Sequence, residues 1–244
     1  MLIATGASPK IPDINGIKKS GVFKFRTIKD TKDIEALLPV VKNACVLGGG
    51  LIGLKAAYGL KKRNIDVKVI VKSKQVLSQM LDFESASFLQ KRLEENSIEL
   101  VLGEDVVEVI GNGDIKAVKL ESGKVLGCSL VVVGKGVSPN IDLIKDTKIK
   151  FNEGIIADKL MQTNIPNIYT AGDVCESFDI TSGEFSVNAL WPIAVEQGRI
   201  AGVNMSGERL EYDGSLSMNA IEFFGLAAVS LGVYKVKGDN GSFE

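Results

Sequence analysis

The chain has 244 residues, of which 45% are hydrophobic and 24% are charged, and its formal net charge is −1. This balance is typical of a globular protein and gives no sign of a nucleic-acid-binding surface. No apolar run reaches the ~18 residues that a membrane-spanning helix requires, and the N-terminus lacks the pattern of a secretory signal.

The sequence contains no histidine and three cysteines. Without histidine, the chain lacks the usual activator of a nucleophile and the commonest metal ligand. Cys45, Cys128 and Cys175 are widely spaced, so they fit neither a disulfide framework nor a zinc site nor a CxxC redox pair. We expect three reduced structural thiols in a cytoplasmic protein, with no metal site. Any chemistry must then come from a cofactor or from unusual lysine or carboxylate groups.

The first predicted element is the apolar run Leu2-Ile3-Ala4-Thr5-Gly6, which indicates a buried strand that enters a tight turn. Lys42–Leu47 predicts a second strand, residues 51–63 a helix, and Asp66–Val71 a third strand. The last three elements form the start of a βαβ unit.

A second helix is predicted at residues 82–96, where Asp82 is a suitable N-cap. Short strands are then expected at 98–102, 106–110, 115–121 and 129–133. The turn Gly111-Asn112-Gly113-Asp114 joins two of them as a hairpin. Beyond these elements we expect a strand at 168–170, a helix at 192–203 and an apolar stretch at Met218–Tyr234. The pattern predicts an α/β fold, with a Rossmann-like parallel sheet interrupted by a β-meander.

A glycine-rich loop, Gly48-x-Gly50-x-x-Gly53, joins the Lys42–Leu47 strand to the helix after it. In a dinucleotide-binding turn, the first glycine makes the bend and the second lets the backbone approach a pyrophosphate. The third allows the helix to contact the strand. The helix N-terminus, here Leu51 and Ile52, offers N–H groups and a partial positive charge to phosphates. A tight turn without a ligand is the alternative, but the strand–helix–strand context favours nucleotide binding.

The end of the third strand departs from the usual nucleotide-binding pattern. An acidic residue normally stands there and binds the adenine ribose hydroxyls, whereas this chain has Lys72, followed by Ser73 and Lys74. A lysine cannot accept hydrogen bonds from hydroxyls, but it can pair with a phosphate. One hypothesis is NADPH preference, with these three residues at the 2′-phosphate. The other is a solvated loop with dual or poor specificity.

Four motifs occur in one order at sensible spacings. They are Leu2-Ile3-Ala4-Thr5-Gly6-Ala7, the Gly48–Gly53 loop, Val131-Val132-Val133-Gly134-Lys135-Gly136-Val137-Ser138-Pro139-Asn140, and Ile168-Tyr169-Thr170-Ala171-Gly172-Asp173-Val174. Together they resemble the pyridine nucleotide-disulfide oxidoreductase superfamily of FAD- and NAD(P)H-dependent flavoproteins. The stretch NALWPIAVEQG at residues 188–198 looks most like the rubredoxin reductase and nitrite reductase-type branch.

The resemblance implies a Rossmann-like NAD(P)-binding domain inserted in a partial FAD-binding domain. We expect the end of the first FAD segment and a linker at 1–40, and the NAD(P)H-binding domain at 41–137. The second FAD segment is expected at 138–210, and the start of a truncated interface domain at 211–244. The FAD domain's own glycine fingerprint is missing. We therefore expect about a hundred residues before Met1 in the intact protein.

The resemblance also implies cofactor contacts. Asp173, after Gly172, would accept a hydrogen bond from the flavin ribityl chain, although it also suits a helix cap. The helix near Trp191 would point its N-terminus at the flavin pyrimidine edge, whereas Trp191 equally suits a plain core position. Thr5 and Gly6 would lie near the adenosine half of FAD. Gly136 would face the nicotinamide nucleotide. The alternative for Thr5, Gly6 and Gly136 is that each simply lies in a tight turn.

Two lysines depart from the family pattern. Lys55 stands where a glutamate is often found near the nicotinamide, and Lys135 replaces a small or apolar residue beside Gly136. A cation close to nicotinamide would disfavour the oxidised, positively charged ring. The alternative for Lys55 is a side chain that extends to solvent.

The implied reaction is hydride transfer from NAD(P)H to FAD, followed by electron transfer to a small redox protein, a nitrite-type acceptor or oxygen. The cofactor carries this chemistry, so no catalytic side chain is required. The alternative functions are an NAD(P)H-binding module without flavin, or a subunit whose partner supplies the missing FAD half. We expect a homo-oligomer or such a partner chain, and neither nucleic acid nor membrane as a partner.

Overall fold

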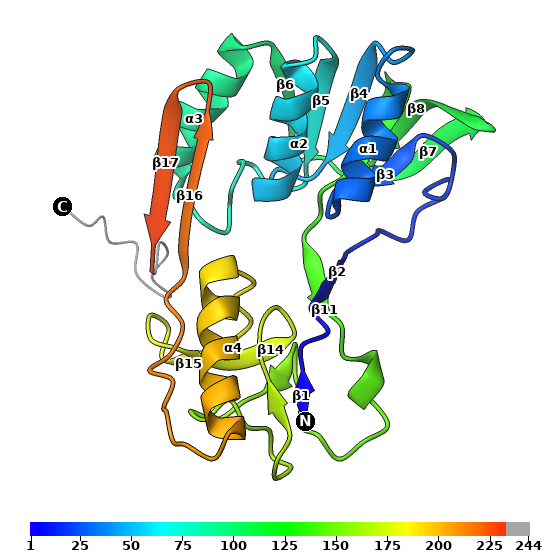
Figure 1. The fold of residues 1–244 in the computed structure, drawn as a ribbon. Coiled ribbons are helices and arrows are strands. Elements are labelled where there is room, and N and C mark those ends of the chain that lie inside the picture. The colour runs from blue at the N-terminus through cyan, green and yellow to red at the C-terminus, as the bar shows by residue number, and fades with distance from the viewer. Residues whose placement is uncertain (233–244) are drawn as a thin grey trace. The chain divides into compact units, whose positions relative to one another are not determined.

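The computed structural model describes residues 1–232 and divides into two compact units. The inserted unit comprises residues 9–136 and 220–229, and the outer unit comprises 1–8, 137–219 and 230–232. Each unit is visible in Figure 1. The outer unit is therefore interrupted in sequence by the inserted one. The inserted unit begins well before residue 41, where the sequence analysis places the start of the nucleotide domain.

The inserted unit is built on a five-stranded sheet in the order β3-β10-β4-β5-β6, in which all neighbours are parallel. Its strands are β3 Val22–Lys24, β4 Asn43–Leu47, β5 Asp66–Val71, β6 Ile98–Leu102 and β10 Leu130–Val133. This arrangement confirms the predicted α/β class with a Rossmann-like parallel sheet. Since both faces of a parallel sheet are usually covered, its strands are expected to be continuously apolar.

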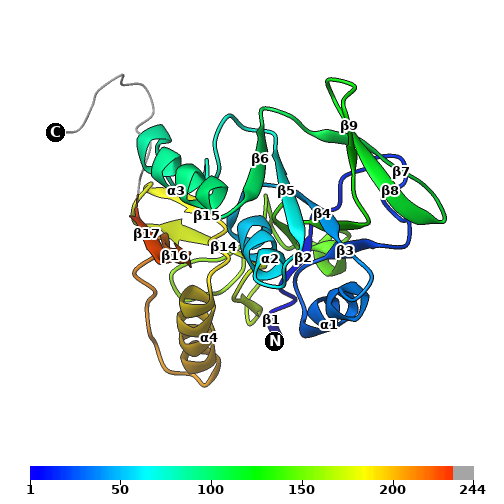
Figure 2. The ribbon, with the colours of Figure 1, turned by 90° about the horizontal axis from the view of Figure 1, so that it is seen from above.

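The side chains of β4 show what covers each face of the parallel sheet. Ala44 and Val46 face a core shared with helices, whereas Cys45 and Leu47 face a second core shared with an antiparallel meander. The meander consists of β7 Val106–Asn112, β8 Asp114–Leu120 and β9 Val125–Gly127. Figure 2 shows the helices and the meander on opposite sides of the sheet. The predicted interruption of the parallel pattern is thus confirmed.

Three helices cover the other face: α1 Ile28–Leu37, α2 Leu51–Lys61 and α3 Phe83–Glu95. The α1 helix was not predicted, although Thr27 and Asp30 form a reciprocal capping box at its start. The Asp82 carboxylate caps α3 as expected, accepting from the Ser85 N–H at 2.6 Å. The α2 helix ends two residues earlier than predicted, and Asn64 takes a left-handed φ of 60° after it.

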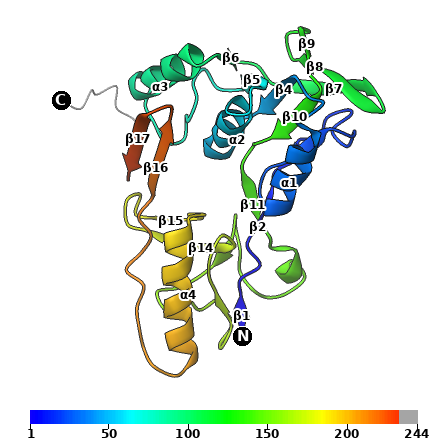
Figure 3. The ribbon, with the colours of Figure 1, turned by 45° about the horizontal axis from the view of Figure 1, so that its top comes forward.

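A C-terminal hairpin, β16 Met218–Phe223 and β17 Leu226–Leu231, packs on α2 and α3 (Figure 3). Phe223 is fully buried and makes an edge contact with Tyr58, and Arg92 donates to the Phe224 carbonyl at 2.8 Å. The core of this unit therefore includes side chains from beyond residue 217, outside the range 41–137 predicted for the nucleotide-binding domain. Tyr234, the end of the predicted apolar stretch, lies outside the described residues.

The outer unit has short strands around one long helix. Its elements are β1 Leu2–Ile3, β2 Ala7–Pro9, β11 Val137–Pro139, the 3₁₀ helix Asp142–Ile144, β12 Ile155–Ile156, β13 Tyr169–Thr170, β14 Cys175–Asp179, β15 Glu184–Ser186 and α4 Trp191–Met205. The first predicted strand could have been left without a neighbour, because the segment expected before Met1 is not part of the chain, but it has one in the structure. It pairs in parallel with β13, and Ile3 is buried.

Asp179 organises the β14–β15 hairpin of the outer unit. Its carboxylate accepts from the Thr181 hydroxyl at 2.6 Å and from the Asn188 amide at 2.9 Å. Burial opposes ionisation, but these hydrogen bonds outweigh it and lower the pKa of Asp179. None of the helices described within residues 1–232 is both long enough and apolar enough to cross a membrane.

Phe223→Ala is expected to destabilise the inserted unit by about 3–5 kcal/mol, because it removes a fully buried ring of this core that packs against Tyr58 of α2. The matched control is Val229→Ala, on the same hairpin, where the side chain is 66% exposed. Urea unfolding followed by circular dichroism measures both. Equal, small shifts for the two variants would show that the hairpin contributes nothing to this core.

Candidate functional site

In the glycine loop at residues 48–53, the backbone of one segment lies in direct contact with the backbone of another. Gly48 has a φ of 114°, and a Cβ at this position would lie 2.4 Å from the Gly134 carbonyl oxygen. A Cβ on Gly53 would lie 2.0 Å from the Gly48 carbonyl oxygen. Both distances are far below van der Waals contact, so Gly48 and Gly53 are required by the fold itself.

Gly50 differs from its two neighbours in the motif. It is the N-cap of α2 with φ −81°, and a Cβ there would meet nothing within 4 Å. The fold therefore does not need glycine at this position, whereas close approach by a ligand would. No side chain caps α2 at Gly50, Leu51 is half-buried, and Ile52 is 46% exposed. This geometry fits a pyrophosphate at the helix N-terminus.

Lys72, at the end of β5, lies among carboxylates. Its ammonium is 3.9 Å from Asp105 and 3.7 Å from Glu121, and its side chain is 72% exposed. Lys135, at the end of β10, makes a closer ion pair with Asp105, at 2.5 Å, and both of these side chains are largely buried. The meander thus places two carboxylates beside the lysines that sequence analysis assigned to a nucleotide.

The other two residues of the predicted phosphate site differ from each other. The Ser73 hydroxyl donates to the Gln75 carbonyl at 2.6 Å, so its hydrogen is used within the loop. Lys74 is exposed, and it extends the positive charge of Lys72 along the same loop.

Lys55 is held by the C-terminal hairpin. Its ammonium donates to the Glu222 carbonyl at 3.0 Å and lies 5.0 Å from the centre of the Phe223 ring. It also lies 5.7 Å from the centre of the Tyr58 ring. These contacts combine a hydrogen bond with cation–π attraction. Because Lys55 is also exposed, these contacts agree with a side chain that extends to solvent, and its place near nicotinamide stays a prediction.

Thr5 and Gly6 are fixed by Asn140. The Thr5 hydroxyl donates to the Asn140 carbonyl at 2.8 Å, and the Asn140 amide donates to the Thr5 carbonyl at 2.8 Å. Gly6 has a φ of 68°, and its carbonyl accepts from the Asn140 N–H. Gly136 likewise has a positive φ, of 84°, and its carbonyl accepts from the Lys10 N–H. All three positions lie in the connections between strands, and both glycines have open space at Cβ.

The Gly172–Asp173 turn is anchored by Gln197 of α4. The Gly172 N–H donates to the Gln197 side-chain carbonyl at 2.8 Å, and the Gln197 amide donates to Ser177 at 3.1 Å. Gly172 has a φ of 79°, so the turn requires glycine. Asp173 is half-buried and leads into the strand β14, not a helix, so its alternative role as a helix cap is wrong.

Trp191 begins α4 and is 85% exposed. The alternative that it is a core residue is therefore wrong. Val195, one turn later, is 58% exposed. No side chain caps α4 at its N-cap residue, Leu190, in the described structure. The start of this helix thus presents backbone N–H groups and an aromatic ring, which suits a planar, electron-rich ligand.

The three cysteines are buried free thiols, as expected. Burial raises the pKa of the Cys175 thiol to about 12. Contact with Cys128, together with burial, raises the pKa of the Cys45 thiol. Cys45 and Cys175 are therefore protonated at neutral pH and are not nucleophiles. Within residues 1–232, no group of three or more acidic, cysteine or histidine side chains is arranged to hold a metal ion.

Sequence reasoning missed three residues that position this site: Asp105, Asn140 and Gln197. Asp105 carried no signal, because its partners Lys72 and Lys135 follow different strands. Asn140 ends a motif directly after Pro139, and nothing in the sequence indicates its partner Thr5. Gln197 had a weak signal, as a polar residue within the buried face of a helix, where its side chain is 2% exposed.

A protein-family profile described as "Pyridine nucleotide-disulphide oxidoreductase" matches residues 1–198. An NADH oxidase of Methanocaldococcus jannaschii is 39% identical over 87% of this chain and 48% of its own length. An assimilatory nitrate reductase electron transfer subunit of Bacillus subtilis is 35% identical over 95% of this chain and 29% of its own length.

Among solved structures, a NAD-dependent persulfide reductase from A. fulgidus superposes with a TM-score of 0.92 at 30% identity. The superposition covers 95% of this chain and 43% of that protein. The chain thus spans about half the length of its relatives, or less. The family consists of enzymes that use FAD and NAD(P)H. With most of its length matched, the chain belongs to the pyridine nucleotide-disulphide oxidoreductase family.

Proposed function

We propose that the chain is part of an FAD-dependent NAD(P)H oxidoreductase, which passes hydride from NAD(P)H to flavin and electrons on to an acceptor. The observation that carries this proposal is Gly50, a glycine with no structural need, at an α2 N-terminus without a side-chain cap. A pyrophosphate there receives N–H groups from Leu51, Ile52 and Gly53. The nicotinamide and the flavin supply the redox chemistry when bound.

The residues proposed for FAD lie in the outer unit. Asp173 offers a carboxylate to a ribityl hydroxyl, on a turn fixed by Gln197. The N-terminus of α4, with Trp191, offers positive partial charge and an exposed ring to the flavin pyrimidine edge. Thr5 and Gly6, fixed by Asn140, lie on the adenosine side in this proposal. Because these contacts are already held in place by Gln197 and Asn140, no side chain has to rearrange when the cofactor binds.

A second function is an NAD(P)H-binding module that takes up no flavin. It is favoured by the inserted unit, which carries the whole glycine loop and its own core. The acceptor in the main proposal is a small redox protein, a nitrite-type acceptor or oxygen. The B. subtilis electron transfer subunit favours a protein acceptor by similarity. We place the protein in the cytoplasm, where its three buried thiols stay reduced.

Gly50→Ala is expected to weaken NAD(P)H binding by about tenfold or more, because its methyl group occupies the space for the pyrophosphate. The free energy of unfolding should not fall, since the site is open and its φ suits alanine. Gly53→Ala is the contrasting variant, expected to lose about 1–3 kcal/mol through overpacking. Isothermal titration and urea unfolding measure the two effects. Unchanged nucleotide affinity in a folded Gly50→Ala variant would contradict the site.

Lys72→Ala is expected to weaken NADPH binding by about tenfold and to leave NADH binding unchanged, because only NADPH carries a 2′-phosphate. Glu121→Gln, which removes a competing carboxylate 3.7 Å from Lys72, should tighten NADPH selectively. Titration of each variant with both nucleotides tests this. If the wild-type chain binds NADH as tightly as NADPH, the phosphate site is wrong and the solvated-loop alternative holds.

FAD is expected to bind the chain and to co-elute with it as a yellow fraction on gel filtration. Asp173→Ala should lose the colour and keep its NAD(P)H affinity, since the residue lies outside the inserted unit. Circular dichroism checks that the variant remains folded. A colourless wild-type chain that still binds NAD(P)H would favour the second function over the first.

A further inference from the structure

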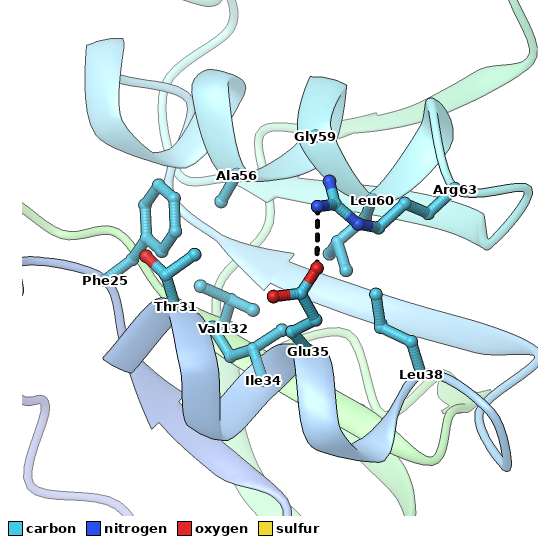
Figure 4. Close-up of a pocket in the computed structure, with 10 residues that line it drawn as sticks. All are labelled: Phe25, Thr31, Ile34, Glu35, Leu38, Ala56, Gly59, Leu60, Arg63 and Val132. Carbon is cyan, nitrogen blue, oxygen red and sulfur yellow. Dashed lines mark hydrogen bonds and ion pairs between the residues drawn. The ribbon is translucent and has the colours of Figure 1, made fainter. Parts of the chain in front are cut away.

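A cavity of about 70 Å³ lies between α1 and α2 on the helical face of the inserted unit. Figure 4 shows its apolar lining and the charged pair beside it. The apolar lining comprises Phe25, Ile34, Leu38, Ala56, Leu60 and Val132. The pocket opens to solvent on the side of Glu35 and Arg63, and an apolar group that enters it is removed from water.

Gly59 opens this cavity. It lies inside α2, where glycine costs about 1 kcal/mol relative to alanine. A Cβ there would meet nothing within 4 Å, so no neighbouring atom requires glycine. Its φ lies outside the positive range in which glycine is favoured, so the backbone conformation does not require it either. What distinguishes Gly59 from the other open helical glycines, such as Gly202, is that it lines an apolar pocket beside an ion pair.

Glu35 and Arg63 form the polar side of the cavity. The Arg63 guanidinium is 2.9 Å from the Glu35 carboxylate, and the side chains are 51% and 56% exposed. Exposed ion pairs contribute little to stability, so a ligand can exchange its own charges for this contact at small cost. Two adjacent opposite charges complement a zwitterion, with an ammonium on Glu35 and a carboxylate on Arg63.

The volume limits the apolar part of the ligand. An engineered apolar cavity that takes benzene has about 150 Å³. This cavity, at about 70 Å³, is roughly half as large and suits a short branched alkyl group instead of a ring. We propose that the cavity binds a free aliphatic α-amino acid, such as valine or leucine, with its side chain against Gly59 and its charged groups on Glu35 and Arg63. The site is independent of the nucleotide and flavin proposals.

Isothermal titration of the full chain with valine and leucine tests the ligand class. Both are expected to bind saturably in the millimolar range, as suits so few contacts. Isobutylamine and isovalerate each keep one charge, and phenylalanine keeps both charges with a larger ring. All three should bind about tenfold more weakly or not at all. Absence of saturable valine and leucine binding, or equal binding of the single-charge analogues, would overturn the proposal.

Gly59→Leu is the deciding variant, because its side chain fills the open space and leucine favours a helix. It should abolish amino-acid binding and leave the melting temperature equal or higher. Gly202→Leu is the matched control, since Gly202 is also a helical glycine with open space, in α4. It should bind like the wild type. Arg63→Gln should weaken binding about tenfold. Binding retained by a folded Gly59→Leu variant would show that the ligand lies elsewhere.

Discussion

The structure depends on one close contact between backbones, where the N-terminus of α2 meets the carboxyl ends of β4 and β10. A Cβ on Gly134 would lie 2.6 Å from the Gly53 Cα, and Gly48 touches both segments. Because no side chain fits in this contact, the helix is held against the carboxyl edge of the sheet. In this position Gly53 and Leu54, in the first turn of α2, are buried, whereas Gly50, the N-cap before them, keeps open space at its Cβ position.

The α2 helix packs against several neighbouring elements, and few of its side chains are large. Ala57 packs in the sheet core, Tyr58 meets the C-terminal hairpin, and Gly59 faces the cavity beside α1. Small residues at a helix surface let neighbouring elements approach closely, but they leave hollows where no neighbour does so. The same composition therefore explains both the tight packing at one end of α2 and the open space near the other.

The sequence predicted β5 and β6 with their observed limits, since each is a short apolar run bounded by turn residues. It did not predict α1, because Ile34 is the one residue of that helix that is buried and the apolar periodicity is correspondingly weak. The hairpins β14–β15 and β16–β17 were missed as well. Their stability comes from Asp179, and from Phe223 packed on distant helices, and local propensity records neither contact.

The charges of the candidate site show most clearly that contacts between residues distant in sequence are not predicted from the sequence. The sequence placed three unexpected lysines, Lys55, Lys72 and Lys135, around one nucleotide. In the structure Lys135 is largely buried and pairs with Asp105, Lys55 donates to a carbonyl of the hairpin, and the Lys72 side chain is 72% exposed. The carboxylates that pair with Lys72 and Lys135 stand at the ends of the meander strands, Asp105 before β7 and Glu121 after β8. In the proposed phosphate site, selectivity for a 2′-phosphate would therefore depend on how fully Asp105 and Glu121 offset Lys72, and a count of basic residues in the loop does not measure it.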